Sequence, residues 1–354
     1  MPGAIATTDY HTAGEPFRIV HGDAPVPAGA TVAERRVSAI ANDDGADSVR
    51  ALLCQEPRGH ADMYGGFIVP PNPVGDGETP AHFGVLFWHK DGFSTACGHG
   101  TIALGVWATD TGLVESDPDG VTEVRIDVPS GHVSAFVERA EGRLVRATFR
   151  NVPSHVIARG VEVSTSRGIA RADLSFSGAI YASVRAADVG LAVSPEHYPE
   201  LIAIGREVKW ALNDAPEAQH DADPRLSGVY GTILWEELGG SGSGVNGAGV
   251  SGVSTATGPR QRNVTVFADG EVDRSPCGSG TGARVALLAD DGTLGADQIF
   301  EHRSIVDTVF EARWEATNRE GVVVPHVAGT AYRTGEHRFY LDFDDALGAG
   351  FVLR

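Results

Sequence analysis

The chain is built mainly from short apolar runs separated by turn residues. Three runs rich in β-branched and aromatic residues, at 84–89, 123–128 and 263–270, are bounded by Gly, Pro, Asn or Asp. This pattern is typical of β-strands of ordinary length. We therefore expect a strand-rich chain in which helices are the minority.

Three stretches depart from this pattern and carry apolar residues at helical spacing. Two of them, 100–114 and 280–294, are rich in Ala, Leu and Val and end near Gly112 and Gly292, which favours helices that stop at a glycine. A third helix is predicted within 195–213 and should pack against the core. Its apolar face consists of Leu201, Ile204, Val208 and Leu212.

The first two predicted helices belong to an internal repeat with an offset of 180 residues. Residues 97–112 (CGHGTIALGVWATDTG) then align with 277–292 (CGSGTGARVALLADDG). The identical pairs are Cys97/Cys277, Gly98/Gly278, Gly100/Gly280, Thr101/Thr281, Ala103/Ala283, Asp110/Asp290 and Gly112/Gly292. Because the match is centred on two of the 3 cysteines, the repeat predicts two similar domains with one copy each.

Length and composition agree with two domains. A chain of 354 residues exceeds the usual size of one core, and the strand pattern changes near 145–155, so we place the domains at 1–150 and 151–335. Residues 239–258 are rich in Gly and Ser and lack apolar periodicity, which predicts a flexible surface insertion.

Charge and targeting signals narrow the function. The formal net charge of −19 opposes binding to nucleic acids and to anionic lipid surfaces. No apolar run reaches the roughly 20 residues of a membrane span, and the N-terminus lacks the pattern of a signal peptide, so we expect a cytoplasmic protein. Three distant cysteines do not suit a disulfide-stapled fold.

Each repeat copy has the form strand, Cys-Gly-x-Gly-Thr, helix, which places a cysteine at a helix N-terminus. Unpaired N–H groups there favour anions, so we expect a lowered thiol pKa and a cradle for a carboxylate. Inverting an α-carbon requires a base on one face and an acid on the other. Cys97 and Cys277, facing each other across a cleft, suit cofactor-independent racemisation of an amino acid, with His99 and Asp273 near the substrate amine.

Other polar residues are interpreted as structural. Cys54 lies in an apolar context and is expected to be an inert core residue. Asp110 and Asp290 are expected to hydrogen-bond within the turns that follow their helices. No metal site is predicted, because no two histidines have the spacing of a ligand pair and no second cysteine accompanies His99. The histidines to which this applies are His11, His60, His82 and His89. The copies also lack the lysine of a phosphate-binding loop.

At these residues the chain resembles the proline racemase family, which includes proline racemases, 4-hydroxyproline 2-epimerases and trans-3-hydroxy-L-proline dehydratases. The resemblance runs nearly end to end, and DRSPCG together with CGHG is its most specific part. The matching segments are HTAGEP (11–16), EPRGHADMYG (56–65), CGHGTIALG (97–105), LSFSGAIYASV (174–184), YGTI (230–233), DRSPCGSGT (273–281) and GFVL (350–353).

This resemblance implies a diaminopimelate-epimerase-like α/β fold. Each of two similar domains would be a mixed β-barrel around a central helix, with strands from 336–354 returning to the first domain and the active site in the interdomain cleft. It also implies a homodimer, a small-molecule substrate and no cofactor. The implied bases are Cys97 and Cys277, and the implied carboxylate cradle is Gly98, His99, Gly278 and Ser279. Asp273 with His99 would hold the amine.

The substrate is less sharply indicated. Dehydratases of the family typically carry threonine at the position of Cys277, so this cysteine favours racemisation or epimerisation. Other segments of the chain, however, are more similar in sequence to the dehydratases. The positions of the family's aromatic wall are Tyr64, Phe87 and Phe267. Two phenylalanines favour proline, because a ring hydroxyl against them would lose its hydrogen bonds to water at ~1–3 kcal/mol. Tyr64 keeps 3- or 4-hydroxyproline open.

Three alternatives therefore accompany proline racemisation. The first two are 4-hydroxyproline 2-epimerase and trans-3-hydroxy-L-proline dehydratase. The third is a non-enzymatic role as a cysteine redox sensor or an amino-acid-binding protein.

Overall fold

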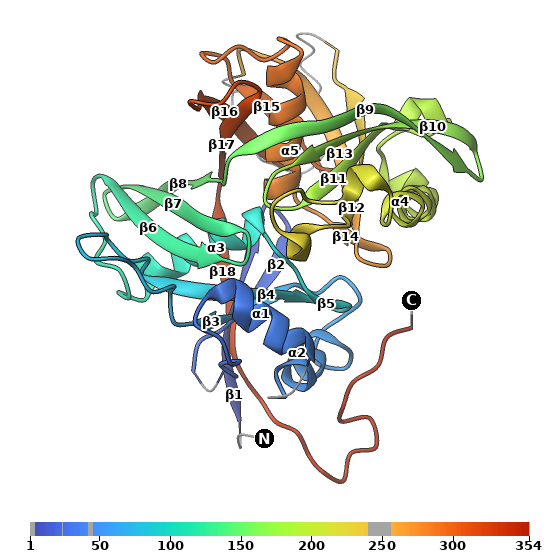
Figure 1. The fold of residues 1–354 in the computed structure, drawn as a ribbon. Coiled ribbons are helices and arrows are strands. Elements are labelled where there is room, and N and C mark those ends of the chain that lie inside the picture. The colour runs from blue at the N-terminus through green and yellow to red at the C-terminus, as the bar shows by residue number, and fades with distance from the viewer. Residues whose placement is uncertain (1–3, 23, 42–44, 240–255, 354) are drawn as a thin grey trace. The chain divides into compact units, whose positions relative to one another are not determined.

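The computed structural model describes residues 4–22, 24–41, 45–239 and 256–353. Within it the chain forms two compact units: the first contains residues 1–150 and 330–354, the second residues 151–329 (Figure 1). Most of the predicted insertion at 239–258, namely residues 240–255, lies outside the described residues.

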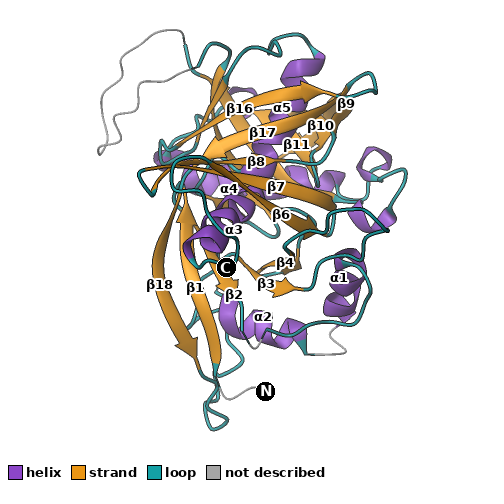
Figure 2. Cartoon of the chain, turned by 90° about the vertical axis from the view of Figure 1, so that its left-hand side faces the viewer, coloured by secondary structure: helices purple, strands orange, loops and turns teal. Residues whose placement is uncertain are grey.

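The first unit is a mixed sheet wrapped around one helix (Figure 2). Its strands pair in the order β18, β1, β2, β3, β4, β6, β7, β8, with parallel pairing at β2–β3 and β4–β6 and antiparallel pairing elsewhere. The bounds are β1 (Ile5–Thr12), β2 (Glu15–Val20), β3 (Gly65–Val69), β4 (Phe83–His89), β5 (Gly92–Phe93), β6 (Val121–Val128), β7 (Gly131–Ala140), β8 (Arg143–Arg150) and β18 (Ala331–Phe339).

Helix α3 (Gly98–Asp110) is the central helix of this unit. It contacts strands at both ends of the sheet, and every residue from Gly98 to Thr109 is buried, so no face of it is left to solvent. Gly105 allows the close approach, because a Cβ there would lie 2.5 Å from the Cβ of Ala135 on β7.

The second unit is a closed mixed barrel. Its strands pair in the order β9, β10, β11, β12, β13, β15, β16, β17, and β17 pairs back with β9. The bounds are β9 (Ser154–Thr165), β10 (Gly168–Phe176), β11 (Ile180–Arg185), β12 (Val229–Glu237), β13 (Arg260–Phe267), β14 (Glu271–Asp273), β15 (Phe300–Arg303), β16 (Val309–Ala316) and β17 (Val322–Gly329). This confirms the predicted α/β class with mixed sheets around a central helix.

Helix α5 (Gly278–Asp290) is the central helix of the barrel and the repeat counterpart of α3. Its residues from Gly278 to Leu288 are buried, and it contacts β9, β10, β11, β16 and β17. Both central helices begin one residue after a cysteine and end before a glycine at positive φ, Gly112 at 71° and Gly292 at 75°. Left-handed backbone of this kind terminates a helix at glycine without strain.

Helix α4 (Tyr198–Leu212) confirms the third predicted helix. Its predicted apolar face is buried against β12 and β13. Short 3₁₀ turns lie at Ala186–Val189, Pro195–His197, Pro216–Ala218 and Pro224–Leu226. The strands predicted at 84–89, 123–128 and 263–270 correspond to β4, β6 and β13.

The sequence pattern missed two helices of the first unit, α1 (Val32–Ala41) and α2 (Ala46–Cys54). Both are short, and both bury an arginine whose polar end binds backbone carbonyls, so their faces are not purely apolar. Arg35 donates to Pro70 O, and Arg50 donates to the carbonyls of His89 and Lys90. None of the described helices has the length and apolar sequence that a membrane span requires.

The aspartates at the ends of the central helices are not turn residues, which corrects our expectation. Asp110 accepts a hydrogen bond from Tyr10 on β1 and pairs with Arg139 on β7 at 2.5 Å. Asp290 pairs with Arg159 on β9 at 2.8 Å. Each carboxylate therefore ties the end of a central helix to the surrounding strands.

Tyr10→Phe should lower the free energy of unfolding. The hydroxyl of Tyr10, a residue only 1% exposed, donates to the Asp110 carboxylate at 2.8 Å, and a hydrogen bond to a charged group is worth about 1.5–3 kcal/mol. Tyr332→Phe is the control, because Tyr332 is 53% exposed and its loss should stay within ~0.5 kcal/mol. Urea denaturation measures both, and equal changes would contradict the assignment.

Candidate active site

Cys97 is the N-cap residue of α3. Its extended backbone directs Sγ back to the helix start, where it accepts a hydrogen bond from the N–H of Gly100 at 3.2 Å. Glycine is required at 100, because a Cβ there would lie 2.8 Å from that sulfur. The carbonyl of Cys97 accepts the N–H of Thr101 at 3.0 Å and its hydroxyl at 2.8 Å, which fixes the first turn.

Cys277 repeats this arrangement at the start of α5. Its Sγ accepts the N–H of Gly280 at 3.4 Å, and its carbonyl accepts the N–H of Thr281 at 2.7 Å. The backbone differs from the first copy, because Cys277 has φ of 62° whereas Cys97 has φ of −155°. A non-glycine residue at positive φ carries strain that the surrounding structure must maintain, and such residues concentrate at functional sites.

Both helix starts can accept an anion. The first N–H groups of a helix have no partner within it, and the predicted cradle residues Gly98, His99, Gly278 and Ser279 occupy these first-turn positions. Ser279 is 1% exposed, and its Oγ has no hydrogen-bond partner in the part of the chain that the structure describes. A buried hydroxyl in this state is a ready donor for a bound carboxylate.

A group of aromatic rings begins beside Cys97 within the first unit. His99 lies with both ring nitrogens 3.5 Å from the sulfur, and its ring meets Tyr64 edge-on at 5.0 Å between centroids. Phe17 links this group to Phe87, since its ring lies 5.9 Å from His99 and 6.0 Å from Phe87. The three predicted residues of this group, His99, Tyr64 and Phe87, therefore come together with Cys97.

This aromatic group is not purely apolar. The hydroxyls of Tyr64 and Ser94, both buried, hydrogen-bond to each other. Thr12 also donates to the carbonyl of His99 at 2.9 Å, which anchors the first turn of α3 to β1.

Cys277 lies in a buried apolar cluster of the second unit with Ile233 and Ala283, and polar side chains border its sulfur. Its Sγ is 3.9 Å from the hydroxyl of Tyr181 on β11 and hydrogen-bonds with Thr265 on β13. Asp273 lies beside it, and the Oδ1 of Asp273 accepts the backbone N–H of Ser275 at 2.8 Å and its hydroxyl at 2.6 Å. Asp273 therefore orders the turn that leads into Cys277.

The predicted residue Phe267 reaches Cys277 through an aromatic stack. Its ring stacks on Tyr230 at 5.6 Å, and Tyr230 meets Tyr181 edge-on at 5.5 Å. Phe267, Tyr230 and Tyr181 thus form a row of three rings. Tyr181 is the ring beside the sulfur, and Phe267 is the ring farthest from it.

The ionisation of Cys277 corrects one expectation. Burial raises the pKa of the thiol well above its usual value, and the negative charge of Asp273 raises it further. The N–H of Gly280 and the hydroxyl of Thr265 act in the opposite direction but are the weaker influences. The helix start alone therefore does not make this sulfur a thiolate, and Cys277 is a protonated thiol at neutral pH.

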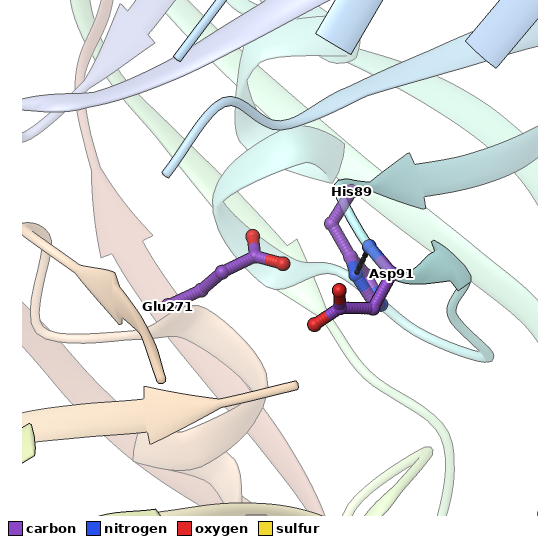
Figure 3. A group of neighbouring side chains, drawn as sticks. All are labelled: His89, Asp91 and Glu271. Atoms are coloured by element: carbon purple, nitrogen blue, oxygen red, sulfur yellow. Dashed lines mark hydrogen bonds between the residues drawn. The ribbon is translucent and has the colours of Figure 1, made fainter. Parts of the chain in front are cut away.

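The four histidines for which the sequence predicts no metal site each accept a hydrogen bond from the backbone. The Nδ1 atoms of His11, His60, His82 and His89 each accept a backbone N–H, from Gly14, Asp62, Arg125 and Asp91 respectively. Figure 3 shows the bond from Asp91 to His89 at the turn between β4 and β5. Burial lowers the pKa of His89 to about 3, so its ring is neutral.

Sequence reasoning missed several residues around the two sulfurs. They are Phe17, Ser94, Tyr181, Tyr230 and Thr265. Tyr181 and Tyr230 lie in segments that carried the family resemblance, 174–184 and 230–233, but nothing in the linear sequence indicated that they approach Cys277. None of the 3 cysteines, all of them in the described residues, forms a disulfide.

Known proteins of one family match this chain over nearly its whole length. The family model described as proline racemase matches residues 7–352. A trans-3-hydroxy-L-proline dehydratase of Burkholderia ambifaria is 39% identical over 357 residues, covering 99% of this chain and 98% of that protein. A 3-hydroxyproline 2-epimerase of Burkholderia multivorans is 38% identical over 359 residues, covering 99% of this chain and 98% of that protein.

A solved structure agrees with the fold. A hydroxyproline epimerase from Agrobacterium vitis, with bound trans-4-hydroxy-L-proline, has a TM-score of 0.85 at 26% identity, covering 99% of this chain and 96% of that one. With the repeated cysteine-capped helices and the match from end to end, the chain belongs to the proline racemase family of enzymes.

Proposed function

We propose that this enzyme is a cofactor-independent 2-epimerase of a hydroxyproline, with 3-hydroxyproline as the first candidate substrate and with Cys97 and Cys277 as its acid–base pair. The observation that carries the proposal is the cysteine at the N-cap of each repeat helix, held there by the N–H of the third helical residue. A structural role would not require the same sulfur position twice, once at the cost of a positive φ.

The mechanism follows from the different surroundings of the two sulfurs. Cys277 is the protonated partner because burial and Asp273 raise its pKa. In the direction that starts from this state, Cys97 as thiolate removes the α-proton and the thiol of Cys277 delivers a proton to the opposite face. The helix-start N–H groups and the hydroxyl of Ser279 bind the carboxylate and take up the charge that develops on it.

The roles proposed for the remaining predicted residues fit their positions. Gly98 and Gly278 expose the backbone N–H groups that hold the carboxylate, and His99 and Asp273 orient the amine from their places beside Cys97 and Cys277. Phe87 and Phe267 supply the apolar wall for the pyrrolidine ring.

A ring hydroxyl finds partners in this site. Tyr64 and Ser94 form a hydroxyl pair directly beside His99, so a hydroxyl on the substrate can replace its hydrogen bonds to water. Both curated relatives described above are named for 3-hydroxyproline. For these two reasons we propose a hydroxyproline as the substrate, although the two phenylalanines by themselves favour proline.

The second candidate is trans-3-hydroxy-L-proline dehydratase, which the name of the 39% identical relative favours. Both reactions begin by removal of the α-proton and differ in the next step. Epimerisation returns a proton to the α-carbon, whereas dehydration expels the 3-hydroxyl. A thiol at 277 supplies the returning proton, and for that reason we place epimerisation first. The homodimer stays a prediction of the family resemblance, and the cytoplasmic location stays a prediction from the N-terminal sequence and the lack of a long apolar run.

The enzyme should exchange the α-proton of 3-hydroxyproline with solvent deuterium in the absence of pyridoxal phosphate, metal or nucleotide. Cys97→Ser and Cys277→Ser should each reduce inversion by at least ~100-fold, because an alcohol is a far weaker base than a thiolate. Cys54→Ser is the control, since Cys54 lies in the core and its Sγ donates to Met63 O. NMR measures deuteration, and its absence for proline and for 3- and 4-hydroxyproline would favour the sensor or binding alternative.

The products of the same incubations separate the two candidate reactions. Chiral chromatography should detect the 2-epimer of 3-hydroxyproline with its ring hydroxyl retained. Formation of the cyclic imine with no inverted product would establish the dehydratase instead. Cys277→Thr adds the converse test, but its melting temperature must be measured in parallel, because a β-branched residue at φ of 62° is strained.

Tyr64→Phe should change the substrate preference without abolishing inversion. Loss of its hydroxyl should lower kcat/KM for the hydroxyproline roughly 5- to 10-fold, which corresponds to about 1–1.4 kcal/mol of transition-state stabilisation, and should leave kcat/KM for proline nearly unaffected. Ser94→Ala, which removes the other hydroxyl, is the matched variant. An equal loss with proline would show that Tyr64 supports the fold of the site and does not read the ring hydroxyl.

The titration of Cys277 can be measured without activity. In a Cys54→Ser, Cys97→Ser background, the ultraviolet absorbance of the thiolate should appear only above the pH of an ordinary cysteine (pKa ~8.5), because the pKa of Cys277 is raised. Adding Asp273→Asn should move the midpoint to lower pH, since a neighbouring negative charge is removed. Asp269→Asn is the control on the same hairpin. A midpoint at or below the ordinary value would contradict the acid role of Cys277.

A further inference from the structure

A pocket of about 370 Å³ lies in the second unit, along the C-terminal half of α5. It is separate from the cysteine end of the same helix. Arg284, Leu287 and Leu288 line it, whereas Cys277 precedes the first helical residue. The rise along the helix from Gly278 to Leu287 is roughly 14 Å. The pocket therefore has no part in the chemistry proposed above.

Arg284 is the unusual residue of this pocket. It is 3% exposed, its Nε donates to Gln261 Oε1 at 3.1 Å, and its guanidinium lies over the ring of Trp235 at 4.1 Å. Among the described residues, no carboxylate lies within ion-pair distance of Arg284 and no group accepts a hydrogen bond from its Nη atoms. Burial lowers the pKa of Arg284 to about 10, which leaves it charged at neutral pH.

The other arginines of the pocket are differently placed. Arg159 pairs with Asp290 at 2.8 Å, and Arg260 pairs with the buried Glu301 at 3.0 Å. A buried cation without a direct ion-pair partner is destabilising, and the Nη atoms of Arg284, for which the described residues provide no acceptor, are available to a ligand in the pocket that Arg284 lines. Stacking on Trp235 and the hydrogen bond to Gln261 hold the guanidinium of Arg284 in one orientation. Its two Nη atoms are then placed to bind a planar carboxylate.

The internal repeat shows that the fold does not need this charge. The residue that corresponds to Arg284 in the first copy is Leu104, which is 0% exposed in α3. A central helix therefore packs in its sheet with an apolar side chain at this position. The arginine of the second copy needs another explanation, and the pocket that it lines provides one.

The charges around the pocket indicate the chemistry of the ligand. Its lining contains three arginines and also three carboxylates, Asp173, Glu237 and Asp291. Asp173 and Asp291 lie 3.7 and 3.8 Å from Arg159, so both signs of charge stand side by side in the lining, and a molecule with both charges can place each end near its opposite. Trp235, Leu287 and Leu288 add an apolar wall for a small side chain.

We propose that this pocket binds a small zwitterion of the amino-acid type, with its carboxylate on the Nη edge of Arg284 and its ammonium group toward the carboxylates of the lining. The site is distinct from the one that carries the two cysteines. It therefore makes this enzyme a protein with two amino-acid sites, one for reaction and one for binding.

Isothermal titration calorimetry tests the proposal with three probes: glycine, acetate and methylammonium. The full-length protein is first saturated with pyrrole-2-carboxylate, a planar ligand for the proposed racemase site. Glycine should bind saturably in the millimolar range, and acetate and methylammonium, which each lack one charge, should bind at least about tenfold more weakly. Arg284→Leu should weaken glycine binding by at least about tenfold.

Variants keep the test independent of stability and of the proposed reaction. Arg284→Leu installs the residue of the first repeat copy and should fold; if it does not, Arg284→Lys retains the charge and should give an intermediate affinity. Glu237→Gln should weaken glycine but not acetate. Arg262→Gln on β13, which removes an arginine paired with Asp307 at 2.9 Å outside the pocket, should leave glycine binding unchanged.

Several outcomes would overturn the site. They are no saturable glycine binding, equal binding to the wild type and to Arg284→Leu, or acetate binding as tight as glycine binding, which would mean an adventitious anion site only. Failure of the reaction proposed for the two cysteines would leave each of these measurements interpretable, because none of them uses turnover.

Discussion

Burial of an entire helix inside a sheet is the constraint on which each half of this molecule depends. α3 and α5 have no solvent face, so the sheet must approach them closely and their ends must be satisfied within the protein. Gly105 and Gly282 allow that approach, since a Cβ at 105 would meet Ala135 at 2.5 Å and one at 282 would clash with Ser177 Oγ. Arginines on strands pair with the aspartates at the helix C-termini. At each helix N-terminus a cysteine sulfur accepts one backbone N–H, and the remaining first-turn N–H groups can bind a ligand.

The two helix starts share a hydrogen bond but not an environment. Cys97 lies against the aromatic group of His99 and Tyr64, whereas Cys277 lies among Tyr181, Thr265 and Asp273. This difference gives the two sulfurs different electrostatic surroundings at equivalent helix starts. Asp273 illustrates how one residue acts twice, because it orders the turn before Cys277 and its charge adds to the effect of burial in raising the pKa of the thiol.

Divergence between the repeat copies also extends along the helices. The pair Leu104 and Arg284 shows that one copy kept an apolar core position where the other acquired a buried charge. Hydrophobic packing sets the requirement at both positions, so a charge is tolerated only where stacking on Trp235, a bond to Gln261 and a pocket compensate for burial. The repeat is therefore informative both where its copies agree and where they differ.

Features that depend on local pattern could be predicted from the sequence. Apolar spacing identified α3, α4 and α5, glycines marked the helix ends, and the repeat placed Cys97 and Cys277 at equivalent helix starts. The sequence did not reveal α1 and α2, whose buried arginines interrupt the apolar pattern.

The surroundings of the sulfurs depend on long-range packing and could not be predicted from local sequence. Tyr181, Thr265 and Asp273 reach Cys277 from three different strands, and Ser94 meets Tyr64 across thirty positions of the chain. The sequence alone suggested a lowered thiol pKa for Cys277, because helix N-terminal N–H groups are a local property. The structure reversed this direction, because burial and the nearby carboxylate arise from long-range packing, and the pKa of a buried group depends on everything packed around it.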